Sequence, residues 1–249
     1  MNLRQGEVEQ LALLDSPGAP RDDWRVRPSP RARRLAVRVL PGGLVEIVVP
    51  RGTRPRTIEQ FVTRHRPWIE RKVALYRPLE AVPAGRLPAR IEFAASGQGY
   101  ELQFVESAAS PRLIVDGAIL RLHGAQARPA LLRHVLQRFT MREAHATLAP
   151  WLAGLAASTG FHYERIQIRR QRTRWGSCSR SGTISLNACL LFQPPAVVNY
   201  LLIHELAHTR HMNHSRRFWR LLERLEPGWR ELDAALSAGW RVVPSWALG

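Results

Sequence analysis

The sequence predicts an α+β fold, in which short strands and amphipathic helices occupy separate stretches of the chain. Two β-branched runs between residues 34 and 50 flank Pro41-Gly42-Gly43, which indicates a β-hairpin whose glycines supply the positive φ of the turn. Several short apolar segments, separated by turn residues, follow between residues 91 and 122. Beyond residue 129, apolar positions recur mainly at helical spacing.

Helical spacing predicts a series of amphipathic helices. They cover residues 57–76, 129–158, 196–211, 215–225 and 229–238. In the first of them Thr57 is the candidate N-cap, and Trp68 is expected to join the apolar stripe. In the second, Pro150 is expected to kink or divide the helix, because proline lacks the amide hydrogen that a helix interior uses.

Two further strands, over residues 161–172 and 184–191, are expected to be neighbours in a sheet. The segment that joins them contains Arg174 and Cys178, and its hairpin is a candidate edge strand along which a peptide pairs through its backbone. Arg174 is expected either to bind a substrate carboxylate or to brace the site through a carboxylate pair. A nucleophilic or metal-binding Cys178 is the less favoured interpretation.

Three regions are expected along the chain. They are a loosely ordered tail over residues 1–24, a β-rich N-terminal lobe over 25–125 and a second lobe over 126–249. The tail is inferred from acidic residues, glycine and prolines that follow no long period.

Composition limits the class of protein. The chain has 249 residues, of which 45% are apolar, and this excludes a collagen-like, disulfide-scaffold or wholly disordered protein. No run approaches the roughly 20 apolar residues of a membrane-spanning helix. The first 24 residues contain no signal-peptide core. With only two cysteines, we expect a cytoplasmic protein without a membrane partner.

The charge is strongly positive, at +17, with 37 basic against 20 acidic residues. Residues 25–80 hold 14 of the basic residues and four of the acidic ones. Codon usage that favours arginine explains such an excess without a function. The alternative is a contact surface for nucleic acid or another polyanion. Its candidate residues are Arg25, Arg27, Arg31, Arg33 and Arg34.

The segment His204-Glu205-Leu206-Ala207-His208 carries the clearest chemical signal. On a helix, two histidines four residues apart lie on one face, one turn above the other. Imidazoles at that spacing hold one Zn²⁺ ion, and the glutamate beside them takes a proton from a zinc-activated water.

A catalytic zinc site needs a third protein ligand. His214 lies six residues beyond His208, as does the third ligand of the pattern H-E-x-x-H-x-x-G-x-x-H, although that pattern has glycine where this chain has His211. A continuous helix would put His211 about 10 Å from His204 along its axis, too far for one ion. We therefore favour His214, reached through a left-handed turn at Asn213. Competing ligands are Glu223, Glu226 and Glu231.

His211 has two interpretations. It is expected to hydrogen-bond a metal ligand or to stabilise the oxyanion of the reaction. The alternative is a solvated histidine that interacts with the negative end of the helix dipole.

The segments RWGSCSRSGTISLN (174–187) and HELAHTRHMNHSRRFW (204–219) resemble the YgjP-like metallopeptidases, which are relatives of the SprT-like zinc proteases. The resemblance extends upstream to RRLAVRVLPGGLVEIVVPRGT (33–53) and PWIERK (67–72). It implies a zincin-like metallopeptidase core in the second lobe, with the active-site helix packed on a small sheet. It also implies His204, His208 and His214 as ligands and Glu205 as the catalytic acid/base.

The function expected from the motif and the resemblance is a zinc-dependent metalloprotease, with one Zn²⁺ per chain and a protein or peptide substrate. Glu205 is the expected general base. SprT-like relatives that degrade proteins on DNA offer a link to the basic charge. Three alternatives stay open: a nucleic-acid-associated protein whose zinc site is structural or vestigial, a hydrolase of another bond, and another divalent metal.

Overall fold

The computed structural model describes residues 24–77, 87–106, 110–124 and 129–248. The chain divides into two compact units, Met1–Arg77 and Pro78–Gly249, which are taken in turn. The tail expected over residues 1–24 lies outside the described residues, except for Trp24, which begins a strand. In the described part of the chain, the helices are either too short or too polar to cross a bilayer.

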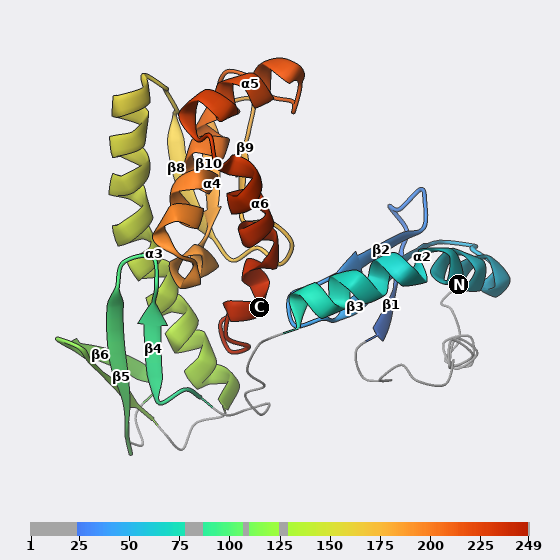
Figure 1. The fold of residues 1–249 in the computed structure, drawn as a ribbon. Helices are drawn as coiled ribbons and strands as arrows, with labels where there is room; N and C mark the ends of the chain where they lie inside the picture. Colours follow the sequence, from blue (N-terminus) through green and yellow to red (C-terminus); the bar gives the residue numbers. More distant parts are fainter. Residues whose placement is uncertain (1–23, 78–86, 107–109, 125–128, 249) are drawn as a thin grey trace. The chain divides into compact units, whose positions relative to one another are not determined.

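The unit formed by residues 24–77 is a three-stranded sheet with one helix across it (Figure 1). Its elements are β1 (Trp24–Ser29), β2 (Ala36–Val39), β3 (Val45–Pro50) and α2 (Pro55–Tyr76). The strand order is β1-β3-β2, and β2 pairs antiparallel with β3, so the expected hairpin is confirmed. Gly42 and Gly43 have φ angles of 87° and 85°, as the turn requires. The parallel strand β1 is an addition to the expected elements.

Alternate residues of β3 form the core beneath α2. The buried side chains on the two elements are Val45, Ile47, Val49, Ile58, Val62 and Ile69. Two expectations for α2 are wrong. The helix begins at Pro55 with Arg54 as N-cap, because proline suits the first helical position, and Thr57 already lies inside it. Trp68 is 39% exposed, because its neighbour Ile69 takes the buried position.

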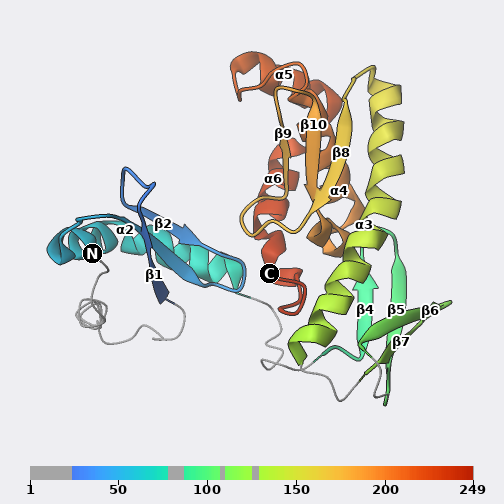
Figure 2. The same ribbon diagram turned by 180° about the vertical axis from the view of Figure 1, so that it is seen from behind.

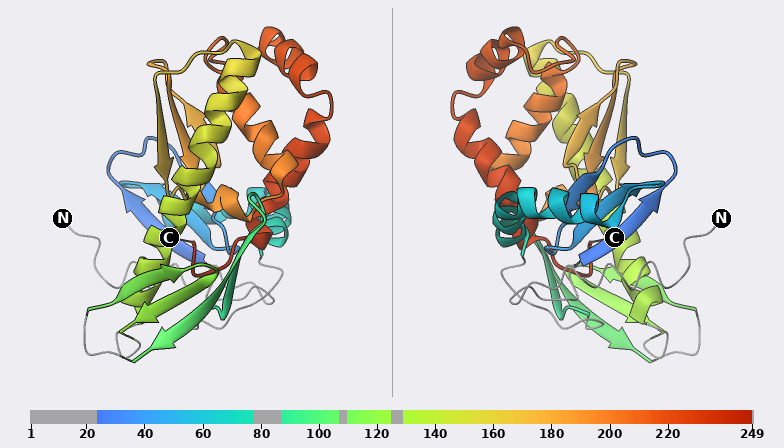
Figure 3. Two further views of the ribbon diagram at one scale, coloured as in Figure 1. Left: turned by 90° about the vertical axis from the view of Figure 1, so that its left-hand side faces the viewer. Right: turned by 90° about the vertical axis from the view of Figure 1, so that its right-hand side faces the viewer.

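The second unit contains a four-stranded sheet in the order β4-β5-β7-β6. Its strands are β4 (Arg90–Phe93), β5 (Gln98–Val105), β6 (Arg112–Asp116) and β7 (Ile119–His123), which confirms the short strands expected between residues 91 and 122. The long helix α3 (Pro129–Thr159) packs on this sheet and continues past it to β8 (Arg165–Arg169) (Figure 3). Pro150 lies inside α3 and does not divide it.

An aromatic cluster joins the four-stranded sheet to the helical part of the unit. Phe93 on β4 lies 6.0 Å from Phe139 on α3 and 5.5 Å from Phe192, measured between ring centroids. The amide of Ala95 also donates to the carbonyl of Leu191. These contacts explain why the boundary between the units lies after Arg77 and not between the lobes expected at 25–125 and 126–249.

A small sheet and three helices complete the second unit. They are β8, β9 (Gly176–Cys178), β10 (Thr183–Asn187), the 3-10 turn η3 (Ala188–Phe192), α4 (Pro195–Ala207), α5 (Arg216–Leu225), α6 (Trp229–Ala238) and the 3-10 turn η4 (Gly239–Val242). The sheet order is β8-β10-β9, so the expected neighbouring strands do pair and β9 is an edge strand. α4 packs against β9 and α6 (Figure 1). Trp175, which precedes β9, is buried and stacks on Trp240 at 3.9 Å.

Candidate metal centre

Three histidines from α4 and the segment after it converge on one point. α4 begins at Pro195 and ends at Ala207, four residues earlier than expected, with His208 as its C-cap. The chain then turns back, because the amides of Thr209 and His211 donate to the carbonyls of Leu206 and Ala207. This early turn brings His214 to the helical pair, and one ligand nitrogen from each of His204, His208 and His214 lies within 4.8 Å of the others.

The turn forms without the left-handed residue expected at Asn213. Among the described residues, every positive φ belongs to glycine. The connection instead closes through the amide of Ser215, which donates to the carbonyl of Asn213 over 2.8 Å. That expectation is therefore wrong, although the return of the chain that it was meant to explain does occur.

Two aromatic side chains on α5 support the histidine rings. Phe218 is fully buried and stacks on His208, with ring centroids 4.6 Å apart and planes at 27°. Trp219 stacks on His214 at 5.3 Å and 24°. These contacts hold the second and third imidazoles against the core.

Hydrogen bonds at the far side of two rings leave their other nitrogens available. The Nδ1 atom of His208 lies 3.0 Å from the carbonyl oxygen of His211. Because a carbonyl oxygen only accepts, His208 donates from Nδ1 and keeps a lone pair on Nε2. The contact of His211 with this candidate ligand is made by its backbone carbonyl, and the expected role of its imidazole stays a prediction.

His204 is oriented by a two-step chain of hydrogen bonds. Its Nδ1 atom lies 3.4 Å from the hydroxyl of Tyr200, one helical turn earlier. That hydroxyl donates to Oδ1 of Asp233 on α6 over 2.8 Å. Burial, together with the hydrogen bond to Asp233, raises the pKa of Tyr200 well above its usual value, so the hydroxyl keeps its proton.

The histidine cluster fits a zinc ion. Burial and the neighbouring His208 and His214 lower the pKa of His204 to about 3, and burial also lowers the pKa of His208. Both rings are therefore neutral, which is the form that binds metal. The Nε2 atoms of His204 and His214 are 3.2 Å apart. Two nitrogens on a tetrahedral zinc ion lie about 3.4 Å apart, and three such ligands leave one position open.

The competing carboxylate ligands do not join this cluster among the described residues. Glu223 instead accepts hydrogen bonds from the indole of Trp229 and the guanidinium of Arg230. It therefore connects α5 to α6.

Glu205 is on α4, and its side chain packs against β9 and is buried, with 4% of the residue exposed. Its Oε2 atom is buried and has no hydrogen-bond partner among the described residues. Burial raises the pKa of Glu205 to about 8, against the opposing charge of Arg174. A Cβ atom on Gly176 of β9 would lie 2.6 Å from Oε1 of Glu205, so glycine is needed for this close approach. Buried polar atoms are usually hydrogen-bonded, so an unpartnered carboxylate oxygen at this position points to a functional role for Glu205.

Cys178 keeps its proton at neutral pH. Burial, reinforced by the charge of Glu205, raises the pKa of its thiol to about 11. The thiolate is the form that attacks carbon or binds metal. Without a metal, Cys178 is therefore a weak nucleophile.

The sequence matches the family described as "YgjP-like, metallopeptidase domain" over residues 33–238. The chain belongs to the YgjP-like family. A solved structure, the crystal structure of the metallopeptidase zymogen of Pyrococcus abyssi abylysin, is similar at 29% identity over 35% of this chain and 89% of that chain, with a TM-score of 0.33. A search of curated proteins gives no match. Membership of a YgjP-like metallopeptidase family implies a divalent metal and a protein or peptide substrate.

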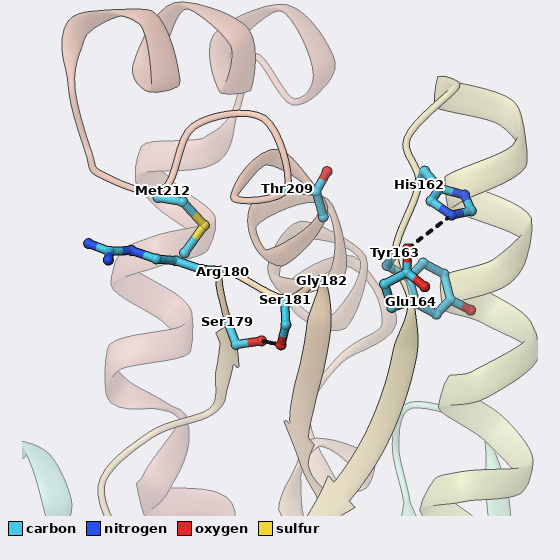
Figure 4. A pocket seen from close by; sticks show the side chains of 9 residues that line it. All are labelled: His162, Tyr163, Glu164, Ser179, Arg180, Ser181, Gly182, Thr209 and Met212. Carbon is cyan, nitrogen blue, oxygen red and sulfur yellow. Dashed lines mark hydrogen bonds and ion pairs between the residues drawn. The ribbon is translucent and has the colours of Figure 1, made fainter.

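This YgjP-like chain has a pocket of about 370 Å³ whose lining includes Thr209, the residue that follows the candidate ligand His208 (Figure 4). It is bordered by the turn between β9 and β10 and by the connection from α4 to α5. Its lining residues are His162, Tyr163, Glu164, Ser179, Arg180, Ser181, Gly182, Thr209 and Met212. Met212 and Arg180 lie on one side of the opening, and His162 and Glu164 form an ion pair on the other. The pocket adjoins the end of the edge strand.

Sequence reasoning missed Tyr200, Asp233 and the contact of Gly176 with Glu205. The sequence did contain a signal for Tyr200, because it lies four residues before His204 and therefore shares its helix face. Asp233 belongs to another helix, 33 residues from Tyr200, and no local pattern links the two. Gly176 lies in the segment singled out for its resemblance, but its partner is known only from the packing of α4 on β9.

Replacing Tyr200 by phenylalanine is expected to weaken zinc binding about 10–100-fold, the usual effect of losing an outer hydrogen bond to a ligand. The ring that fills the core stays, so the fold is kept. A competition titration with a chromophoric chelator measures the affinity, and Tyr163→Phe, at the pocket, is the matched control. Unchanged zinc affinity in Tyr200→Phe would limit the hydroxyl to a packing role.

Proposed function

We propose that the protein is a zinc-dependent metallopeptidase in which Glu205 transfers the protons. One observation carries the proposal: three histidine nitrogens converge at the end of α4, and the residue that follows His204 is a buried carboxylate with one oxygen that has no partner among the described residues. The packing of α4 on the small sheet supports a zincin-like metallopeptidase core. Family membership supports peptide hydrolysis as the reaction.

His204, His208 and His214 would hold one Zn²⁺ ion per chain. When bound, this ion lowers the pKa of a water molecule and polarises the substrate carbonyl. Glu205 takes a proton from the water at its free carboxylate oxygen and delivers it to the leaving amine. Burial is the larger influence and raises the pKa of Glu205 to about 8, while the charge of Arg174 lowers it in part, so the ionised form that accepts the proton increases as the pH rises toward 8.

The edge strand β9 supports binding of an extended peptide. β9 pairs with β10 on one side, so its other edge is available for backbone hydrogen bonds to a substrate. A peptide lying along it passes Gly176, which is in contact with Glu205, and continues toward the pocket at the β9–β10 turn. The exposed Arg174 lies just before β9 and is placed to bind a substrate carboxylate.

Metal removal and replacement test the proposed function. The full chain, stripped of metal by a chelator, is expected to cleave no member of a mixed library of fluorogenic peptides. Addition of about one equivalent of zinc per chain is expected to restore cleavage. Zinc binding without cleavage of any peptide would favour a structural or vestigial site. Cleavage that survives metal removal would contradict the proposal.

A further inference from the structure

One face of the sheet in residues 24–77 carries a cluster of arginines. α2 covers the opposite face, and Figure 2 shows the strands in front of the helix. Because side chains alternate along a strand, Glu46 points away from the core that Val45 and Ile47 form. Strand pairing sets Arg25 of β1 and Arg38 of β2 opposite Glu46.

Glu46 gathers three guanidinium groups around itself. It pairs with Arg25, with Arg27 over 3.3 Å and with Arg38 over 3.9 Å. The side chain of Glu46 is 6% exposed. Burial opposes its ionisation, but the hydrogen bonds and charges of Arg25 and Arg27 outweigh burial and lower its pKa. The carboxylate is therefore ionised at neutral pH and orients the arginine side chains. We name Arg25, Arg27 and Arg38 the arginine face.

The arginine face has more charge than the carboxylate neutralises. Three cations around one anion leave a surplus of two positive charges, whereas one arginine would be enough to compensate a buried glutamate. The three side chains are 43%, 44% and 53% exposed. Each guanidinium has five N–H donors, and one carboxylate cannot accept from all of them. The remaining donors face solvent.

The surrounding unit extends this positive charge. Residues 24–77 hold 14 basic and three acidic residues, which gives +11 of the total +17. Arg31, Arg33 and Arg34 are exposed in the connection between β1 and β2. If the arginines served only to stabilise the fold by pairing with Glu46, the unit would not need so many additional positive charges.

We propose that the arginine face binds the phosphodiester backbone of nucleic acid, without sequence preference. Guanidinium groups match phosphate oxygens in geometry and charge, forming paired hydrogen bonds. The Cα atoms of Arg25 and Arg27 lie two residues apart on one strand, about 6.6 Å, and that of Arg38 lies two strands away, at about 10 Å, but Glu46 draws the three guanidinium groups together. They form one compact positive site, and the exposed Arg31, Arg33 and Arg34 extend the charge toward further phosphates of a polymer. The three residues of the face include no aromatic side chain, which is the usual platform for stacked bases, so phosphate contact is the expected mode.

Fluorescence anisotropy of the full chain with a labelled oligonucleotide tests this proposal. Binding to DNA or RNA of any sequence is expected to weaken steeply between about 50 and 200 mM salt. In the variant R25Q/R27Q/R38Q, the slope of log K against log salt is expected to fall by about 3. The single variant R38Q leaves Arg25 and Arg27 paired with Glu46 and is expected to lower the salt slope by about 1. If the triple variant misfolds, R38Q is the variant that tests the proposal.

A matched charge control separates the face from the bulk charge. R138Q/R165Q/R220Q removes three exposed arginines from the other unit and is expected to leave the salt slope unchanged. An equal loss in both triple variants would overturn the proposal, as would the absence of salt-dependent binding. Tighter binding to polyglutamate, or to vesicles of anionic lipid, than to nucleic acid would replace it with an acidic-protein or membrane partner.

Discussion

Glu205→Gln is expected to lower the rate of peptide cleavage by about 10²–10⁴-fold while the chain keeps one bound zinc ion. The amide has nearly the shape of the carboxylate and fills the same space beside Gly176, but it cannot accept the proton from the attacking water. Cleavage rates measured with saturating zinc, beside the zinc content from elemental analysis, separate loss of the reaction from loss of the metal.

Glu223→Gln provides the matched control. Glu223 is exposed and joins α5 to α6 through Trp229 and Arg230, outside the histidine cluster. This variant is expected to retain nearly full activity. If Glu205→Gln cleaved peptide as fast as the Glu223 variant, Glu205 would have no part in proton transfer.

His214→Ala is expected to weaken zinc binding by more than the 10–100-fold typical of outer hydrogen-bond partners. Its Nε2 atom lies 3.2 Å from that of His204, so its loss removes one of three nitrogens. His211→Ala is the close control, because the group of His211 that contacts His208 is the backbone carbonyl. That variant is expected to bind zinc as tightly as the unsubstituted chain.

Zinc affinities of these two variants, measured by competition with the same chelator, decide between the histidines. Equal affinity in His214→Ala and the unsubstituted chain would move the third ligand elsewhere. A larger loss in His211→Ala than in His214→Ala would assign the imidazole of His211 to the metal.

The sequence was informative wherever the cause was local. The four-residue spacing of His204 and His208 places both on one helix face whatever the surroundings, and this geometry predicts the pair directly. The glycines at 42 and 43 likewise define their hairpin, because few other residues adopt positive φ. The preference for His214 followed from the rise of a helix per residue, although the turn that brings it back differs from the one expected.

Predictions from sequence were wrong where two nearby residues were equally suited to the same structural position. Thr57 and Pro55 each suit a helix start, and Trp68 and Ile69 each suit an apolar stripe. The preference of proline for the first helical position selects Pro55, and the packing of α2 on β3 selects Ile69. Pro150 is tolerated within α3, which is held by packing along its length against the four-stranded sheet and β8.

The hairpin, the histidine pair with its glutamate and the surplus of arginine follow from residue order alone. The groups that act on them come together through packing. Asp233 reaches His204 through Tyr200, Gly176 closes over Glu205, and Glu46 collects arginines from two other strands. Apart from the pairing of Arg38 with Glu46 within the hairpin, these contacts join elements 19 or more residues apart, and short-range spacing carries no information about which helix or strand packs beside another. Burial, which shifts the pKa values of His204 and Glu205, arises from the same packing.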